Sequence, residues 1–174
     1  LEEAELYLHP QAQKSLLYSL ENLSLNSQVV LCTHSSSLIS LEKYKSIAIV
    51  RKDNETKETN ITQYQEEILE EDEKKNFQLV SWINQDRAEL FFAKKVILLE
   101  GATEKTVIPY IAKKLGIFKY EYTLIDCGSK NNIPSYVKLL EKFKIPYIAV
   151  YDKDHQIRKQ QDAMDIADRV KKKI

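Results

Sequence analysis

The chain has 174 residues, of which 43% are hydrophobic and 30% charged, with 26 basic and 26 acidic side chains. This length suffices for one good hydrophobic core or two small ones. No apolar run is long enough to cross a membrane and no signal-peptide pattern is present, which argues against a membrane or secreted protein. Cys32 and Cys127 lack the spacing of a disulfide framework, which favours the reducing cytoplasm. We expect both cysteines to be small, buried strand-end residues.

The first residue is Leu1 and the single methionine is Met164, so we expect an internal piece of a longer protein. Residues 1–93 hold 9 basic and 16 acidic side chains, whereas residues 94–174 hold 17 and 10. A basic second half predicts a polyanionic substrate that is bound through its phosphates. The alternative is that these lysine-rich helix surfaces are simply solvated.

The N-terminal part opens on two acids, Glu2 and Glu3, and then predicts one helix and two strands. The helix is indicated by apolar residues at helical spacing, namely Ala12, Leu16, Leu17, Leu20 and Leu23. The apolar run 28–33 predicts a buried strand that leads into His34. Residues 46–51 predict a second strand.

Residues 52–76 are polar and charged, and they predict a connection rather than a core element. Within them, residues 60–62 predict a short strand or hairpin return, and the acids between 66 and 73 predict a solvated connector. Residues 78–93 predict a helix that packs on the core.

Three apolar runs in the second half each end on an acid. Residues 96–99 predict a strand buried on both faces, and Glu100 follows it. The other two runs end on Asp126 and Asp152. Because ligands of parallel α/β sheets bind beyond the carboxyl ends of the strands, we expect these three acids on one shared rim.

Two further acids lie close to this rim in the sequence. Glu104 falls in the first helical turn after Gly101, which permits a sharp turn, and Asp154 follows Asp152 by two residues. Crowded carboxylates repel one another unless a cation neutralises them, and oxygen ligands without Cys or His suit Mg²⁺ or Mn²⁺. The predicted metal ligands are Glu100, Glu104, Asp152 and Asp154. The alternative is ordinary solvated loop acids, and for Asp126 the two interpretations are evenly balanced.

Residues 127–132, Cys-Gly-Ser-Lys-Asn-Asn, follow the second of these strands. Such a loop at the start of a helix can receive a phosphate through backbone N–H groups, although a plain turn explains it nearly as well. The helix before it is expected to end at Gly116. Its predicted sheet-facing residues are Val107, Ile108, Ile111 and Leu115. Those of the helix after the loop are Val137, Leu140 and Phe143.

Several of these patterns resemble known families. Residues 96–104 followed by Asp-Lys-Asp at 152–154 resemble the TOPRIM (topoisomerase–primase) domain, which is marked by a strand-terminal Glu-Gly, a second Glu and then Asp-x-Asp. Glu-Glu-Ala-Glu-Leu-Tyr-Leu-His-Pro-Gln at 2–11 and Thr-His-Ser at 33–35 resemble the end of the ABC-type ATPase head in the OLD (overcoming-lysogenization-defect) family of ATP-dependent nucleases. The sequence at 87–95 also resembles that family's junction into the first TOPRIM strand.

The resemblance implies an α/β fold with a parallel-sheet, Rossmann-like TOPRIM core. It places this nuclease domain at residues 94–174, behind the C-terminal part of an ABC-type ATPase domain at residues 1–52. A charged connector and a helix at residues 53–93 lie between the two.

For the ATPase part, the resemblance implies that Glu2 helps to hold Mg²⁺, that Glu3 polarises the attacking water and that His34 contacts the γ-phosphate. Ala4 replaces the proline usual at this place, which affects the turn more than the chemistry. The sequence contains no Gly-x-x-x-x-Gly-Lys-Ser/Thr phosphate loop. We therefore expect ATP to bind in an intact parent protein and not to be hydrolysed by this chain alone.

For the TOPRIM part, the resemblance implies Mg²⁺- or Mn²⁺-dependent hydrolysis of DNA, with Glu100 and Asp152 as catalytic residues. Gly128 would lie beside the metal site and Lys130 would contact the scissile strand. The implied context is cytoplasmic phage defence by a homodimer or higher oligomer that ATP regulates, without a membrane. The alternatives are a topoisomerase- or primase-type TOPRIM enzyme and a non-catalytic module that binds nucleic acid or dimerises.

Overall fold

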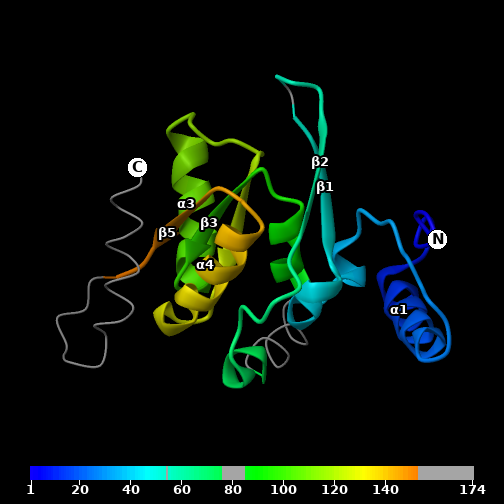
Figure 1. The fold of residues 1–174 in the computed structure, drawn as a ribbon. Coiled ribbons are helices and arrows are strands. Elements are labelled where there is room, and N and C mark those ends of the chain that lie inside the picture. The colour runs from blue at the N-terminus through cyan, green and yellow to red at the C-terminus, as the bar shows by residue number, and fades with distance from the viewer. Residues whose placement is uncertain (54, 76–84, 153–174) are drawn as a thin grey trace.

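The computed structural model describes residues 1–53, 55–75 and 85–152. Within these ranges the chain forms a helical N-terminal segment, an antiparallel hairpin and a parallel α/β unit (Figure 1). In chain order the elements are α1 (Pro10–Ser24), the 3₁₀ helices η1 (Ser36–Leu38) and η2 (Leu41–Ser46), β1 (Ala48–Lys52), β2 (Thr59–Gln63), the 3₁₀ helix η3 (Gln85–Phe91), β3 (Lys95–Leu99), α3 (Ala102–Lys114), β4 (Tyr122–Asp126), the 3₁₀ helix η4 (Lys130–Asn132), α4 (Ile133–Lys142) and β5 (Tyr147–Val150). No helix in the described ranges is long and apolar enough to cross a membrane.

Helix α1 confirms the helix predicted near the N-terminus. It begins at Pro10, whose fixed φ suits the first helical turn. The preceding His9 caps the helix, because its Nδ1 accepts a hydrogen bond from the Gln11 amide at 3.4 Å. Leu20 is the buried residue of this helix, which lies at one side of the molecule and contacts η1 (Figure 1).

The segment 28–33 lies beside the first three residues of the chain and is not a buried strand. Glu2 and Cys32 form an isolated parallel bridge, and the Glu3 amide donates to the Cys32 carbonyl at 2.8 Å. Val30 is 66% exposed and Cys32 is also exposed, so the predictions of a buried strand and of a buried Cys32 are wrong. The burial alternates along the segment, with Val29, Leu31 and Thr33 half-buried and Val30 and Cys32 exposed, so only one face of it is partly covered in the described structure.

The hairpin of β1 and β2 confirms the strand predicted at 46–51 and the return at 60–62. Its register runs from Ala48 opposite Gln63 to Lys52 opposite Thr59. The Nη2 group of Arg51 donates to the Ala93 carbonyl at 2.9 Å, and burial lowers the pKa of Arg51. This contact fastens the hairpin to the segment that leads into β3.

The second sheet confirms the predicted α/β class. In the described ranges it has three parallel strands in the order β4-β3-β5, so that β3 is central. Its residues Val96, Leu98 and Leu99 are buried, as expected for a strand covered on both faces. Parallel neighbours require crossover connections, which α3 and α4 provide.

The hydrophobic core joins this sheet to residues far upstream of it. Its buried members are Leu41, Tyr44, Leu69, Leu90, Phe91, Ala93, Val96, Leu98, Ile125, Cys127, Ile133, Tyr136, Val137, Leu139, Leu140, Phe143 and Ile145. The Phe91 and Phe143 rings meet edge to face, with centroids 5.1 Å apart. The core therefore includes side chains from both sides of the predicted connector.

Helices α3 and α4 differ in how far they are buried. Val137, Leu140 and Phe143 are buried as predicted. By contrast, the predicted core face of α3 is largely exposed, and Leu115 on it is 65% exposed, so that prediction is wrong for the described residues. Helix α4 shares the core with the upstream segment as well as the sheet, whereas α3 contacts β3 and β4. The predicted C-terminal cap at Gly116, with φ of 68°, is confirmed.

The acidic segment before residue 75 was predicted to be a solvated connector, but part of it contacts α4. Glu73 accepts hydrogen bonds through Oε1 from the Ser135 hydroxyl at 2.6 Å and from the Lys138 ammonium at 2.9 Å. Both donors lie on α4, so Glu73 anchors the segment to that helix. A local charge pattern does not reveal this contact, because its partners are more than 60 residues away in sequence.

Replacing Glu73 by alanine should lower the free energy of unfolding relative to wild type. This loss should be larger at neutral pH than at low pH. Burial alone would raise the pKa of Glu73, but hydrogen bonds from Ser135, Lys138 and the Glu70 amide outweigh it and lower that pKa. The depressed pKa means that the stabilisation is present above the ordinary glutamate pKa and is lost as pH falls through the folded-state value. At pH 7 we expect a loss of about 1 kcal/mol, since Lys138 is partly screened by solvent.

Urea unfolding at neutral and acidic pH measures this effect. Glu71→Ala is the matched control, because the exposed Glu71 pairs only with Lys74 in the described structure and should change stability little. A Glu73→Ala defect that stays constant as pH falls would contradict the assigned role of the charge.

Candidate active site

The acids at the ends of β3, β4 and β5 lie on the same side of the parallel sheet, where the carboxyl-terminal ends of the three strands meet. Leu99 is in register with Asp126 on one side and with Val150 on the other. Glu100 therefore follows the central strand, with Asp126 beside it on β4 and Asp152 just beyond β5. The strand order makes Glu100 the centre of the predicted rim.

Glu100 and Asp152 are in direct contact. The Asp152 backbone amide donates a hydrogen bond to Oε2 of Glu100 at 3.2 Å. Glu100 is half-buried and Asp152 is exposed, so one carboxylate is fixed by the fold and the other faces solvent. Asp154, the fourth predicted ligand, lies outside the described residues.

Glu104 is held at the start of α3. Its Oε2 accepts a hydrogen bond from the Gly101 amide at 3.0 Å, as in a capping box. The partial positive charge of the helix N-terminus also favours a carboxylate there. Glu104 is thus positioned next to the Glu100-Gly101 turn by local helix chemistry.

Asp126 closes the turn that follows β4. Its Oδ1 accepts a hydrogen bond from the Gly128 amide at 2.7 Å, and Gly128 has φ of 75°, a left-handed conformation that favours glycine. Ser129 then caps η4, which contains Lys130, by accepting from the Asn131 amide at 3.2 Å. This hydrogen bond gives Asp126 a structural role in the turn, and its role as a metal ligand remains a prediction.

Arg87 is a residue of this region to which sequence reasoning assigned no role. It lies on η3, is only 4% exposed, and its Nη1 donates to the Tyr136 hydroxyl at 3.0 Å. Its Nη2 is 3.3 Å from where a Cβ on Gly128 would stand. The signal that could have indicated its burial is its place directly before a run of core residues, Ala88, Leu90 and Phe91.

Cys127 lies beneath the same turn and is buried, as predicted. Burial raises the pKa of its thiol to about 12, against the opposing effect of the nearby Arg87 charge. The thiol therefore remains protonated at neutral pH and is a packing group. A protonated, buried thiol does not offer a thiolate ligand to the rim, where the described acids present oxygen atoms.

The donor set of the rim suits a hard divalent cation, although the described residues by themselves do not complete a site. In the described part of the chain no three acidic, histidine or cysteine side chains are grouped so as to hold a metal ion. Glu100 and Asp152 are brought together, and both offer carboxylate oxygens. Such ligands, with water and substrate phosphate, are those that Mg²⁺ takes in proteins.

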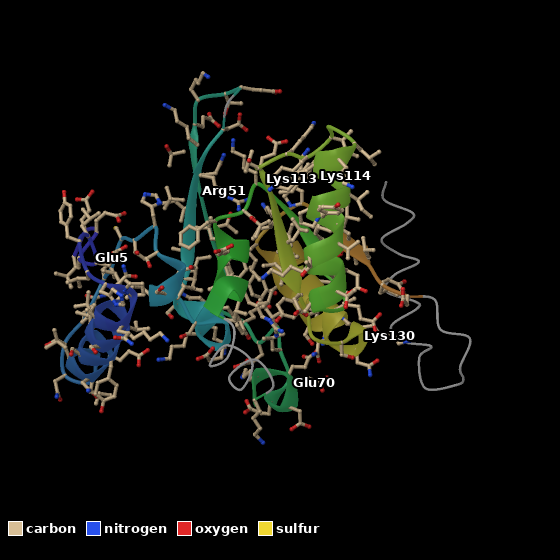
Figure 2. The ribbon with its side chains drawn as sticks, turned by 180° about the vertical axis from the view of Figure 1, so that it is seen from behind. Glu5, Arg51, Glu70, Lys113, Lys114 and Lys130 are labelled. Carbon is tan, nitrogen blue, oxygen red and sulfur yellow. The ribbon has the colours of Figure 1, made fainter. Side chains whose placement is uncertain are left out.

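The residues predicted to contact nucleotide form a separate group at the N-terminal end. Oε1 of Glu3 lies 3.5 Å from Nε2 of His34, whose side chain is 89% exposed, and Glu2 bridges to Cys32. The nearby Glu5 is buried and accepts a hydrogen bond from Thr33. Figure 2 shows Glu5 and Lys130 on opposite sides of the molecule, so the two predicted sites are well apart.

Comparison with known proteins finds one family match that includes the rim acids and another that includes the N-terminal residues predicted to contact nucleotide. The family described as "Overcoming lysogenization defect protein-like, TOPRIM domain" matches residues 91–154, and the family described as "AAA ATPase domain" matches residues 1–39. Residues 91–154 thus belong to the OLD-like TOPRIM family. The rim of Glu100 and Asp152 lies within the OLD-like TOPRIM match, and the contact of Glu3 with His34 lies within the AAA ATPase match.

Three curated relatives are named as nucleases or as an endonuclease. An OLD nuclease of Thermus scotoductus is 28% identical over 159 residues, covering 88% of this chain and 30% of the relative. The endonuclease GajA of Bacillus cereus is 27% identical over 179 residues, covering 88% of this chain and 26% of the relative. The Old nuclease of Escherichia phage P2 is 35% identical over 117 residues, covering 66% of this chain and 20% of the relative. The chain thus spans less than a third of the length of each of these relatives.

Proposed function

We propose that this chain carries the catalytic rim of a metal-dependent nuclease that hydrolyses DNA phosphodiesters. The observation that supports this most is the contact of Glu100 with the Asp152 amide on neighbouring strand ends, inside an OLD-like TOPRIM domain. The names of the curated relatives, which are called nucleases or an endonuclease, agree with this reaction class.

In this proposal Glu100 and Asp152 hold Mg²⁺ or Mn²⁺, with Glu104 and Asp154 as further ligands. When bound, such an ion supplies positive charge against the phosphate and lowers the pKa of a water molecule. The Asp152 amide fixes the orientation of the Glu100 carboxylate. The basic second half of the chain, together with Lys130 at the rim, attracts the phosphate backbone.

The ATPase part has a regulatory role in this proposal. Glu2, Glu3 and His34 contribute to an ATP site in an assembly in which another segment supplies the phosphate loop. The contact of Glu3 with His34 supports that assignment. A homodimer or higher oligomer, working in the cytoplasm in defence against phage, is the setting that we propose for this regulation.

A plasmid cleavage assay with the full-length protein tests the reaction. We expect nicked or linear DNA with Mg²⁺ or Mn²⁺ and none when EDTA removes the metal. An RNA substrate in parallel shows which nucleic acid is cut. Binding without cleavage under every metal condition would overturn the nuclease and favour a non-catalytic nucleic-acid-binding module.

A further inference from the structure

The guanidinium of Arg87 is a buried positive charge with which no described carboxylate pairs directly. Burying a charge is costly unless it is paired and hydrogen-bonded. In the described part of the chain, Arg87 donates one hydrogen bond, to the uncharged Tyr136 hydroxyl, and its Nε is buried without a partner. No described carboxylate lies within 4.0 Å of it. The charge is held in place by the fold, with donors left over.

One edge of this guanidinium faces the turn at the rim. Nη2 lies 3.3 Å from the position that a Cβ of residue 128 would occupy, and Gly128 is exposed. Because residue 128 has no side chain, no Cβ covers Nη2 on this side, and we call this uncovered side of Nη2 the Gly128 opening. A larger residue would cover Nη2 and press against it, and it would also be strained by the positive φ.

This opening is part of the rim that carries the catalytic acids. The Cys127 amide donates to the Leu99 carbonyl at 2.9 Å, which ties the turn to the residue directly before Glu100. The described rim acids are all negative and would repel a nucleic-acid phosphate. The positive charge of Arg87, which approaches the same strand ends from the core, offsets part of that repulsion.

We propose that Arg87 and the Gly128 opening form a recognition site for one backbone phosphate of the nucleic-acid strand. Arg87 presents a planar group with several N–H donors, the geometry that suits a phosphate oxygen pair. Tyr136 holds the guanidinium through Nη1, so that Nη2 is turned toward the rim. This inference rests on the proposed function, because it takes nucleic acid as the ligand.

Binding of a duplex DNA oligonucleotide in EDTA, measured by fluorescence anisotropy over a series of salt concentrations, tests the site. Arg87→Met should weaken binding about tenfold, and should reduce the slope of log affinity against log salt by about one. Gly128→Ala should weaken binding in the same direction by closing the opening. Tyr136→Phe removes the hydrogen bond that orients Arg87 and keeps the charge, so it should weaken binding less than Arg87→Met does.

Thermal unfolding of each variant separates recognition from packing. If Arg87→Met unfolds at lower temperature but binds DNA with wild-type affinity and salt slope, Arg87 is structural and the inference is wrong. If that variant does not fold, ¹⁵N NMR of the wild-type side chain during titration with inorganic phosphate decides the question. A saturable shift of the Arg87 Nε resonance supports the site, and an unchanged resonance overturns it.

The two proposals can fail separately. If Arg87→Met loses metal-free binding while the wild type never cuts DNA, the phosphate site stands and the nuclease proposal falls. If Arg87→Met binds as wild type does, while Glu100→Gln abolishes cutting, the nuclease proposal stands and the Arg87 site falls.

Discussion

Asp152→Asn and Glu100→Gln are each expected to lower the DNA cleavage rate by about a thousandfold or more, since each removes charge that would hold a catalytic cation. Both substitutions keep the contact seen at the rim. The Asp152 backbone amide is unaltered in the first, and the amide oxygen of the new glutamine can still accept from it in the second. The loss therefore reports carboxylate charge rather than collapse of the strand ends.

The same two variants should retain their DNA affinity. Affinity for nucleic acid comes mainly from Lys and Arg contacts to phosphates, and removing a negative charge reduces local repulsion. Plasmid cleavage, filter binding and calorimetric titration with Mn²⁺ together measure the three properties. Glu121→Gln is the matched control, because it removes an exposed carboxylate that lies before β4 at the opposite end from Asp126. Cleavage or Mn²⁺ binding that survives in the double variant of Glu100 and Asp152 would show that another group of residues holds the metal.

Tyr44→Ala is expected to destabilise the parallel sheet by about 3–5 kcal/mol, as truncation of a fully buried aromatic residue does. Tyr44 precedes the hairpin, within the predicted ATPase part, yet it is completely buried in the core that contains Leu98 and Leu140. Its hydroxyl accepts from the Ile68 amide at 2.8 Å and donates to Glu67 at 3.1 Å. Residues upstream of the connector and the sheet should therefore unfold together.

Two further variants sharpen this test. Tyr44→Phe should cost about 1–3 kcal/mol, because it leaves the Ile68 amide without its acceptor. Tyr18→Ala, on the exposed side of α1, should have little effect. Urea unfolding followed by near-ultraviolet circular dichroism provides the measurement. A sheet transition that is unchanged in Tyr44→Ala would mean that the parallel sheet folds independently of the preceding segment.

This shared core bears on the predicted domain boundaries. The predicted nuclease domain begins at residue 94, but the core also takes in Leu41, Tyr44 and Leu69. Arg51 adds a polar link from the hairpin to the Ala93 carbonyl. The boundaries at 52 and 93 remain a prediction, and we expect mechanical coupling across them in any protein that links ATP binding to DNA cleavage.

The sequence by itself determined the strands of the parallel α/β unit and their order along the chain. The strands β3, β4 and β5 were predictable because each is a short apolar run that ends on a polar residue, and this pattern is local. The cap at Gly116 was predictable for the same reason, since glycine adopts the left-handed conformation that ends a helix. Acids at strand ends also indicated the rim, because parallel strands place their carboxyl ends together.

Only the tertiary structure decided which of these residues meet. The pairing order β4-β3-β5, which places Glu100 in the centre, depends on contacts between distant segments. The burial of Arg87 beneath Gly128 and the docking of Glu73 on α4 are decided in the same way. An isolated Arg or Glu is most often solvated, so its local sequence predicts exposure. Packing against a distant helix or turn overrides that preference when hydrogen bonds compensate part of the cost of burial.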